Sequence, residues 1–396
     1  MKGKRVQSIC IILLLVFAVT ATQAGAGTVT VDKNGGGNYT SIQEAVDNAQ
    51  NGDIILVNPG IYPENVVVDK ELTILSNSVS PVNQNNSVYV IGVVSGGQVF
   101  SVNADNVTIN GFHISGGYSE TADSTGIGIL LAGVRNCSLS DNVLVMNNIS
   151  IGLYNSQGNY IGNNSVIGPG SGIVLVGSTE NILSNNLAET GINPEGIGIL
   201  LNSSANNTLD NNIARSGLVG IYLDTSQGNN LTNNIASSNA GGIGIGLNSS
   251  TGNILMNNLA KANKLGVVLD ASDRNTIADN LISKNDIGIF GDGAGSNILL
   301  NNSLYLNGIG VGLSGSSSGN TIYKNKFINI INAVDEGMNF WNSSSEGNAW
   351  NNYTGTDNDG NGMGDTPYFV NQTTGSADYL PTSVENFSAI SSEIET

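Results

Sequence analysis

Apolar residues recur along this chain at every second position in short runs, as in Ile221-Tyr222-Leu223, and glycine, serine and asparagine separate the runs. A period of two puts alternate side chains on opposite faces of a β-strand. Apolar runs with the 3.6-residue period of a helix are absent from the repeated part of the sequence. The pattern therefore predicts an all-β fold of many short strands.

A 14-residue phrase that begins with Ile or Val and ends with Asn recurs nine times, and its ninth copy is one residue longer. Successive copies start 22 to 26 residues apart, a period that indicates a solenoid. The copies are Ile129–Asn142, Ile151–Asn164, Ile173–Asn186, Ile199–Asn212, Ile221–Asn234, Ile245–Asn258, Val267–Asn280, Ile289–Asn302 and Val311–Asn325.

A coil of this length holds three short strands and three turns. Stacking pairs each strand with its copy one coil away, at roughly 4.8 Å per coil. We therefore expect a right-handed parallel β-helix of about 12 coils, in which each coil contacts only its neighbours. Columns of Ile and Leu should fill the interior. The recurring Asn should lie at an inward-facing turn, where Asn tolerates the left-handed conformation and its amide can bond the adjacent coils.

Four segments follow from the pattern: a signal peptide over residues 1–24, the β-helix over 27–335, a C-terminal cap over 336–382 and a flexible tail over 383–396. The capping box Ser41-Ile42-Gln43-Glu44 predicts a short helix that closes the N-terminal end of the solenoid. Both tryptophans fall after residue 336, which indicates an irregular aromatic cap.

The first 24 residues have the features of a secretory signal: a basic start with Lys2, Lys4 and Arg5, then the apolar core Ile9–Val19. We expect a secreted, cell-surface or periplasmic protein with no stable membrane span after cleavage. An uncleaved anchor is the alternative. Cys10 would leave with the signal, so the remaining Cys137 could form no intramolecular disulfide.

Charged residues make up only 11% of the chain, and the net charge of −18 would become −21 when the three basic signal residues are removed. An acidic surface disfavours nucleic acid and anionic membranes as partners. We expect a monomer that binds a polysaccharide or another component of the cell envelope.

Fifteen Asn-x-Ser/Thr sequons are candidate glycan acceptors in an exported protein. Because Asn, Ser and Thr are so frequent, many sequons could be accidental. We expect several of them to belong to the Asn columns and to be buried.

Three stretches carry a family resemblance. Tyr39–Val46 and Pro59–Val66 resemble the opening of pectinesterase-like β-helix proteins, and the repeated coils resemble the carbohydrate-binding and sugar-hydrolase (pectin lyase-like) superfamily. Gly347–Asp357 followed by Gly364–Tyr368 resembles the end of NosD-type β-helix proteins. The resemblance implies the fold. It also implies a role in copper-site maturation outside the cytoplasm, with which NosD-type proteins are associated. The paired aspartates and arginine of pectinesterases are not recognisable after residue 75.

Copper sites group imidazole, thiolate or thioether ligands. The sole histidine, His113, alternates with apolar residues, which is typical of an outward strand position, and the mature methionines Met146, Met256, Met338 and Met363 are scattered. The residues therefore predict no copper site, while the resemblance leaves an accessory role in copper maturation open.

The segment from Asp357 to Asp365 matches the first half of a calcium loop, with Asp357, Asp359, Asn361, Met363 and Asp365 at alternate positions. Tyr368 stands where such a loop has its bidentate Glu, and no flanking helices are evident. The segment predicts calcium in the cap, and a merely polar turn is the alternative.

A second pattern lies ten residues before the terminal Asn of each copy, in a column that becomes polar from Asn202 onward and should face outward. Paired carboxylates one coil apart suit glycosidic cleavage or glycan binding, and the alternative is that they cap turns. The column holds Ala132, Tyr154, Val176, Asn202, Asp224, Asn248, Asp270 and Asp292, with Ser314 beside it in the ninth copy. Asp224, Asp270 and Asp292 are the candidate catalytic residues.

The sequence favours a non-catalytic surface protein that binds carbohydrate or envelope components. A polysaccharide hydrolase, lyase or epimerase that uses the aspartates is one alternative, and a NosD-like copper accessory factor is another.

Overall fold

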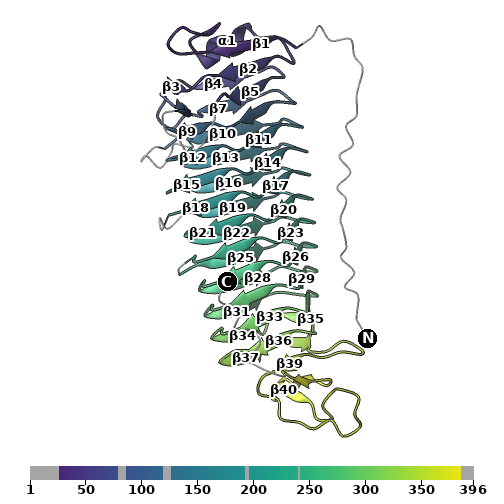
Figure 1. Cartoon of the computed structure of the whole chain (residues 1–396). Coiled ribbons are helices and arrows are strands. Elements are labelled where there is room, and N and C mark those ends of the chain that lie inside the picture. Colours follow the sequence, from purple (N-terminus) through teal and green to yellow (C-terminus); the bar gives the residue numbers. More distant parts are fainter. Residues whose placement is uncertain (1–25, 79–85, 119–125, 192–195, 240, 385–396) are drawn as a thin grey trace, which may run out of the picture.

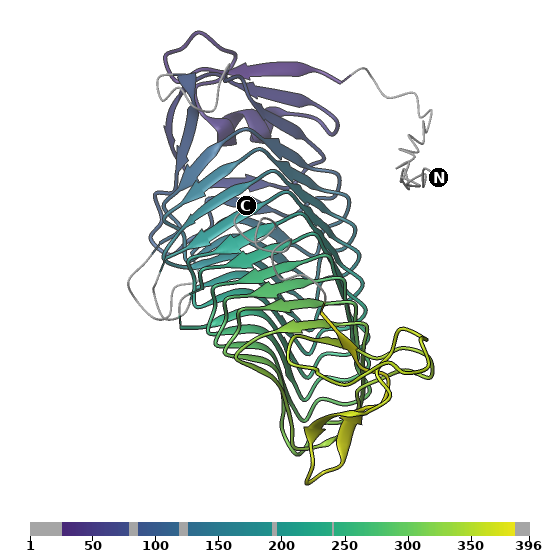
Figure 2. The same cartoon turned by 60° about the horizontal axis from the view of Figure 1, so that its bottom comes forward.

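The computed structural model describes residues 26–78, 86–118, 126–191, 196–239 and 241–384. Within these residues the chain winds into a parallel β-helix with three long sheets, A, B and C (Figures 1 and 2). Each regular coil passes from sheet C to sheet A through turn 1, to sheet B through turn 2, and to the next strand of sheet C through turn 3. The predicted signal, and the predicted tail beyond residue 384, lie outside the described residues.

Sheet A contains β1 (Thr28–Val31), β2 (Ile54–Val57), β5 (Thr73–Ser76), β8 (Thr108–Asn110), β11 (Ser138–Ser140), β14 (Tyr160–Gly162), β17 (Ile182–Ser184), β20 (Thr208–Asp210), β23 (Asn230–Thr232), β26 (Ile254–Met256), β29 (Thr276–Ala278), β32 (Ile298–Leu300), β35 (Ser318–Tyr323) and β38 (Met338–Phe340). Sheet B contains β3 (Gly60–Pro63), β6 (Val88–Ile91), β9 (His113–Ser115), β12 (Val143–Val145), β15 (Ser165–Gly168), β18 (Leu187–Thr190), β21 (Ile213–Arg215), β24 (Ile235–Ser237), β27 (Leu259–Lys261), β30 (Leu281–Ser283), β33 (Ser303–Tyr305), β36 (Lys326–Ile328), β39 (Ala349–Trp350) and β42 (Thr382–Ser383). Sheet C contains β4 (Val66–Val68), β7 (Phe100–Val102), β10 (Ile127–Ala132), β13 (Ile149–Tyr154), β16 (Ser171–Val176), β19 (Ile197–Asn202), β22 (Val219–Asp224), β25 (Ile243–Asn248), β28 (Leu265–Asp270), β31 (Ile287–Asp292), β34 (Ile309–Leu313) and β37 (Ile331–Asp335). The strands β40 (Tyr368–Asn371) and β41 (Ser376–Asp378) form an antiparallel pair.

The predicted parallel β-helix is confirmed, but the expected number of coils was too low. Two of the three sheets hold 14 strands, which corresponds to a solenoid of 14 turns rather than about 12. The coils at both ends lack the repeated phrase, so the sequence period could not reveal them. In the repeated part, strands pair in the expected register, with the first residue of one copy opposite the first residue of the next, as for Ile221 and Ile245.

The helix α1 (Ile42–Asn48) covers the N-terminal end of the solenoid (Figure 1). Its N-cap is Ser41, whose hydroxyl oxygen accepts from the backbone N–H of Glu44 at 3.3 Å. The Glu64 carboxylate accepts from two further N–H groups of the first turn, a favourable position for a negative charge. No helix in the described parts of the chain combines the length and the apolar character needed to cross a membrane.

The recurring asparagines form hydrogen-bonded ladders inside the solenoid, as expected. At Asn234 the side-chain oxygen accepts from the backbone N–H and the amide of Asn212, at 2.9 and 3.0 Å. Its own amide donates to the oxygen of Asn258 at 3.0 Å and to a carbonyl of the preceding coil. The turn-2 ladder comprises Asn142, Asn164, Asn186, Asn212, Asn234, Asn258, Asn280, Asn302, Asn325 and Asn348. The turn-1 ladder comprises Asn159, Asn181, Asn207, Asn229, Asn253, Asn275, Asn297, Asn320 and Asn339.

The left-handed conformation occurs one residue earlier than expected. In turn 2 it belongs to the residue before each ladder asparagine, for example Asn163 with φ 55° and Asn257 with φ 56°. The side chain of each ladder asparagine must point inward. The tight bend of the backbone, with its positive φ, therefore falls on the preceding corner residue. In turn 2 the corner residues are consequently exposed, whereas the ladder asparagines are buried.

Both ladders end on a buried carboxylate in the C-terminal cap. The amide of Asn339 donates to Asp335 at 2.8 Å, and the backbone N–H of Asn348 donates to Asp378 at 2.7 Å. Each carboxylate also accepts the indole N–H of a buried tryptophan. Burial raises the pKa of Asp378, and hydrogen bonds from Asn348, Trp350 and Leu380 oppose that rise. Along each ladder, every amide donates one N–H to the next asparagine oxygen toward the C-terminal end. A carboxylate, which accepts hydrogen bonds without having to donate one, therefore completes each ladder.

Candidate functional site

The predicted polar column lies on the outer face of sheet C at the ends of its strands. Asp270 pairs in register with Asn248 on one side and Asp292 on the other, and Asp224 pairs with Asn248. Asp270 and Asp292 are therefore one strand apart, roughly 4.8 Å between backbones, and Asp224 is two strands from Asp270. Asp270 and Asp292 are exposed and Asp224 is half-buried. We call Asn202, Asp224, Asn248, Asp270 and Asp292 the aspartate column.

Neighbouring polar side chains fix two of these carboxylates. Asn248 donates to Asp224 at 2.7 Å. The hydroxyls of Ser314 and Ser316 donate to Asp292 at 2.6 and 2.8 Å, and these two bonds lower the pKa of Asp292. The column thus presents oxygen acceptors to the outside, two of them oriented by neighbouring side chains, and the bonds to Asp292 favour its ionised form.

Tyr222 lies beside the column, on the same outer face of sheet C. Burial and the negative charges of Asp224 and Asp270 raise the pKa of its phenol. Gly246 on the next strand lies under the ring, and a Cβ atom there would approach the ring to 2.6 Å. An aromatic ring next to a row of oxygen acceptors can contact the apolar face of a sugar while the acceptors bind its hydroxyls.

The spacing and ionisation of the carboxylates bear on whether this arrangement could cleave a glycan or only bind it. The spacing of Asp270 and Asp292 approaches that of the carboxyl pair in retaining glycosidases, roughly 5 Å, but such enzymes need one carboxyl with a raised pKa as proton donor. The hydroxyls of Ser314 and Ser316 lower the pKa of Asp292, so Asp292 suits the role of an acceptor or a nucleophile and not that of the proton donor. Sequence reasoning placed the three aspartates correctly on one outer face, and their chemical role stays a prediction.

The predicted calcium residues lie in one exposed loop of the cap, which has no regular secondary structure. Asp357 accepts the backbone N–H groups of Gly360 and Gly362, both at 2.8 Å, and these bonds, that of Gly362 foremost, lower its pKa. Asp365 accepts from Asn358 across the loop. The loop therefore orients the Asp357 and Asp365 carboxylates by hydrogen bonds, and the bonds to Asp357 favour its ionised form.

The soft donors considered for copper are spread over several coils and the cap. His113 is on β9, next to the ring of Tyr89 at 4.8 Å. Met256, on β26, is six coils further along, roughly 29 Å away. Burial raises the pKa of the Cys137 thiol to about 11, so this residue is not a ready thiolate ligand. Among the described residues, His113, Cys137 and Met256 therefore do not form the grouped imidazole, thiolate and thioether ligands that copper favours.

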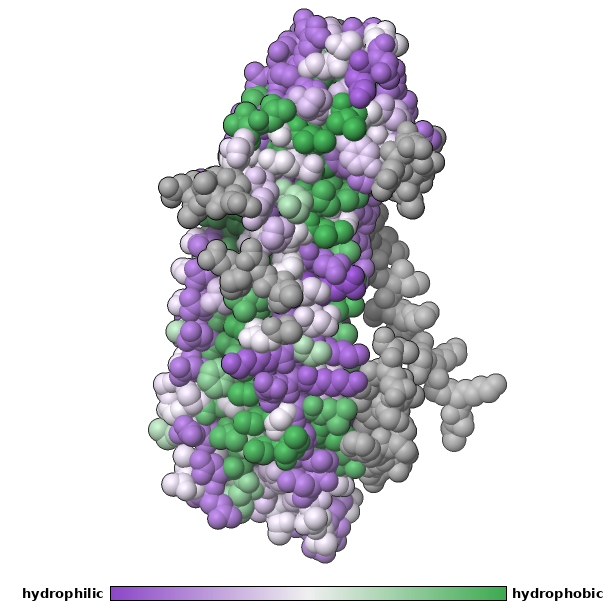
Figure 3. All heavy atoms as spheres, turned by 90° about the vertical axis from the view of Figure 1, so that its left-hand side faces the viewer, coloured by the Kyte–Doolittle hydropathy of each residue, from purple (hydrophilic) through white to green (hydrophobic). Residues whose placement is uncertain are grey.

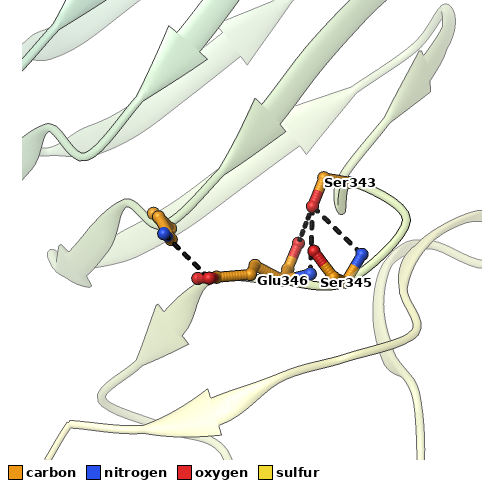
Figure 4. A network of polar contacts seen from close by, with 4 residues as sticks. Ser343, Ser345 and Glu346 are labelled. Atoms are coloured by element: carbon orange, nitrogen blue, oxygen red, sulfur yellow. Dashed lines mark hydrogen bonds and ion pairs between the residues drawn. The ribbon is translucent and has the colours of Figure 1, made fainter.

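A cleft of about 750 Å³ lies between the cap and the last coils, and the sequence did not reveal it. Glu346 forms one wall, where its carboxylate pairs with Lys324 at 2.8 Å. Ser343 and Ser345 hold the Glu346 turn, since the Ser343 hydroxyl accepts from the backbone N–H of Glu346 at 2.9 Å (Figure 4). Met363 of the predicted calcium loop forms another part of the lining. The lining residues come from segments far apart in the sequence, so no local motif could have identified them.

Comparisons with known proteins agree with this architecture. The sequence profile of the family described as "Periplasmic copper-binding protein (NosD)" matches residues 37–214 and 188–355. A "Cell surface glycoprotein" of Methanothermus fervidus is 33% identical over 136 residues, which are 34% of this chain and only 20% of that relative.

Solved structures of similar fold include a complex with xylose and a module of a mannuronan epimerase. DFA-IIIase from Arthrobacter chlorophenolicus A6, in complex with GF2, has a TM-score of 0.54 at 16% identity over 74% of this chain and 91% of its own. XylC, in complex with xylose, has a TM-score of 0.52 at 13% identity over 76% and 75%. The A-module of the mannuronan C-5 epimerase AlgE6 of Azotobacter vinelandii has a TM-score of 0.51 at 14% identity over 79% and 94%. At these identities the likeness establishes the fold alone.

Proposed function

Since this chain belongs to the NosD family of periplasmic copper-binding proteins, we propose that it works outside the cytoplasm as a cell-surface or periplasmic β-helix protein. It binds carbohydrate or another envelope component without cleaving it. The cell-surface relative supports this location, and structural neighbours with bound sugar support the ligand class.

The observation that carries the proposal is the aspartate column, with Tyr222 beside it. Parallel pairing repeats an amide or carboxylate on five successive strands, which gives an extended chain a matching row of acceptors. A saccharide that spans several coils would bind several of these groups at once.

Removing the carboxylates should weaken carbohydrate binding without unfolding the protein. In the triple variant Asp224→Ala, Asp270→Ala, Asp292→Ala, the Kd for the preferred glycan should rise at least about tenfold, since hydrogen bonds to charged groups contribute roughly 1.5–3 kcal/mol each. Glycan-array screening of the wild type selects the ligand, and calorimetric titration measures both proteins.

Asp210→Ala is the matched control, because Asp210 is likewise an outward-facing aspartate at the end of a strand, but on sheet A. Its Kd should equal that of the wild type. Equal glycan affinity for the triple variant and the wild type would exclude the column as the binding surface.

We also propose that calcium binds the loop from Asp357 to Asp365 and stabilises the cap. Calcium at about 100 times its Kd should raise the free energy of unfolding by roughly 2.7 kcal/mol. Differential scanning calorimetry with added calcium, and then with chelator, measures this as a rise and fall of Tm. Asp357→Ala should abolish the calcium response. A Tm that changes neither with added calcium nor with chelator would rule the site out.

A further inference from the structure

The sequons separate into structural classes that the sequence alone does not distinguish. Thirteen of the 15 acceptor asparagines lie in the described residues, and none of them is buried. The expectation that several belong to the buried ladders was wrong. The described acceptors are Asn38, Asn106, Asn136, Asn148, Asn163, Asn202, Asn206, Asn230, Asn248, Asn301, Asn342, Asn352 and Asn371.

Strand geometry explains why a ladder asparagine is never a sequon acceptor. Two residues after the ladder residue Asn164 comes Val166, which points into the core and is 1% exposed, so Ser or Thr is disfavoured there. Asn163, the residue before Asn164, is followed two positions later by Ser165, which is at an outward, half-buried position. The corner position can therefore carry a sequon and the ladder position cannot.

Five acceptors form a corner class with both required groups at the surface. Their asparagines are exposed and left-handed, with φ between 53° and 58°. Their Ser or Thr residues, two positions later, begin strands of sheets A and B and are half-buried. The class consists of Asn106, Asn136, Asn163, Asn206 and Asn301.

Three other acceptors have their hydroxyl inside the solenoid. For Asn148, Asn202 and Asn248 the partner hydroxyls belong to Ser150, Ser204 and Ser250, which are at most 2% exposed. The Ser250 hydroxyl donates to the carbonyl of Asn248 at 2.8 Å and accepts a backbone N–H from the preceding coil. The amide of Asn248 is itself engaged by Asp224.

We propose that the folded protein is N-glycosylated at the corner class and spared at Asn148, Asn202 and Asn248. The sequon requires a hydroxyl, so a transferase that acts on the folded chain must reach both groups. In the transfer, the amide nitrogen of Asn forms a bond to C1 of an activated glycosyl phosphate supplied by the exporting cell. The C1–O bond to phosphate breaks, the phosphate leaves with the electron pair, and the amide loses one proton.

This pattern would place the sugars along the edges of sheet A, because the corner acceptors lie in the two turns that flank it. Asn106, Asn136 and Asn206 are in turn 1, and Asn163 and Asn301 are in turn 2. The aspartate column would stay uncovered, since Asn202 and Asn248 are spared. Among the described residues, no acceptor lies on a strand of sheet B. Figure 3 faces that side of the molecule and shows hydrophobic residues gathered between hydrophilic rows. The inference does not depend on carbohydrate binding by the column.

The test is site-by-site peptide mass spectrometry of the full chain, exported by a host that performs N-linked glycosylation. We expect sugar on the corner class and unmodified Asn148, Asn202 and Asn248. Ser165→Ala should remove the sugar from Asn163 while leaving that asparagine in place, and Asn185→Gln, at a corner without a sequon, should change nothing.

A variant that creates a new sequon tests the proposal by a gain of glycan, which a misfolded protein could not imitate by losing one. Asn257 is an exposed corner residue with φ 56°, and Leu259 is half-buried at the first position of β27. Leu259→Thr completes a sequon in the corner arrangement and should add one glycan at Asn257. Three results would overturn the proposal: sugar on Asn202 or Asn248, corner sites without sugar, or no new glycan on the Leu259→Thr chain.

Discussion

Replacing Asn258 by alanine should lower the free energy of unfolding by about 3–5 kcal/mol, because each buried donor left without an acceptor costs roughly 1–3 kcal/mol. The Asn258 side chain is 2% exposed, and its oxygen accepts from the backbone N–H and the amide of Asn234, at 2.9 and 3.0 Å. Its own amide donates to Leu231 and Asn280. Alanine would remove all four bonds and leave two N–H groups of Asn234 without a partner.

Urea-induced unfolding followed by circular dichroism measures this loss. The matched control is Asn257→Gly, which changes the adjacent corner residue. Glycine adopts a positive φ without strain, so the control should unfold within about 0.5 kcal/mol of the wild type. A similar, small effect for both variants would mean that the ladder is incidental to stability.

Asp378→Ala should open the C-terminal end of the solenoid. Four N–H donors converge on this carboxylate: the backbone and amide of Asn348, the indole of Trp350 and the backbone of Leu380. The ring of Trp350 stacks between Phe327 and Tyr368, with centroid distances of 4.3 and 4.0 Å. Loss of the acceptor should cost about 3–6 kcal/mol, from several unsatisfied buried donors, and should loosen this aromatic stack.

Because coils contact only their neighbours, this damage should be local. Hydrogen exchange should rise in β36, β39 and β42 and stay unchanged in β13 and β16. Asp378→Asn keeps one carbonyl oxygen for the donors and should have a smaller effect. Exchange that rises equally along the whole solenoid would contradict the assignment of Asp378 as a local cap.

The repeat made much of this fold predictable from sequence. A fixed period aligns residues into columns, so the positions of the apolar core, the recurring asparagines and the outward aspartate column could all be read from the repeat. A third ladder, in turn 3, was not predicted. Its members lie five residues after the terminal Asn of four copies and are Asn239, Asn263, Asn285 and Asn307. Its signal was present, but it occurs in only part of the repeat.

The cap could not be predicted in the same way. Asp335 and Asp378 are 43 residues apart in sequence, and nothing local distinguishes these buried ladder ends from the many surface aspartates. The cleft beside Glu346 is likewise assembled from distant segments. Long-range contacts without a repeat leave no periodic trace, so the sequence could show that a cap exists but could not show how it closes.

The most direct test of the central claim, that this is a binding protein and not an enzyme, is one incubation with two readouts. The full chain is mixed with the glycan that it retains best on an array, and mass spectrometry follows both bound and free saccharide. We expect saturable binding, weakened in the triple aspartate variant, and a glycan whose length and stereochemistry stay unchanged. Shortened, unsaturated or epimerised products that disappear in the same variant would show instead that the aspartate column is an active site.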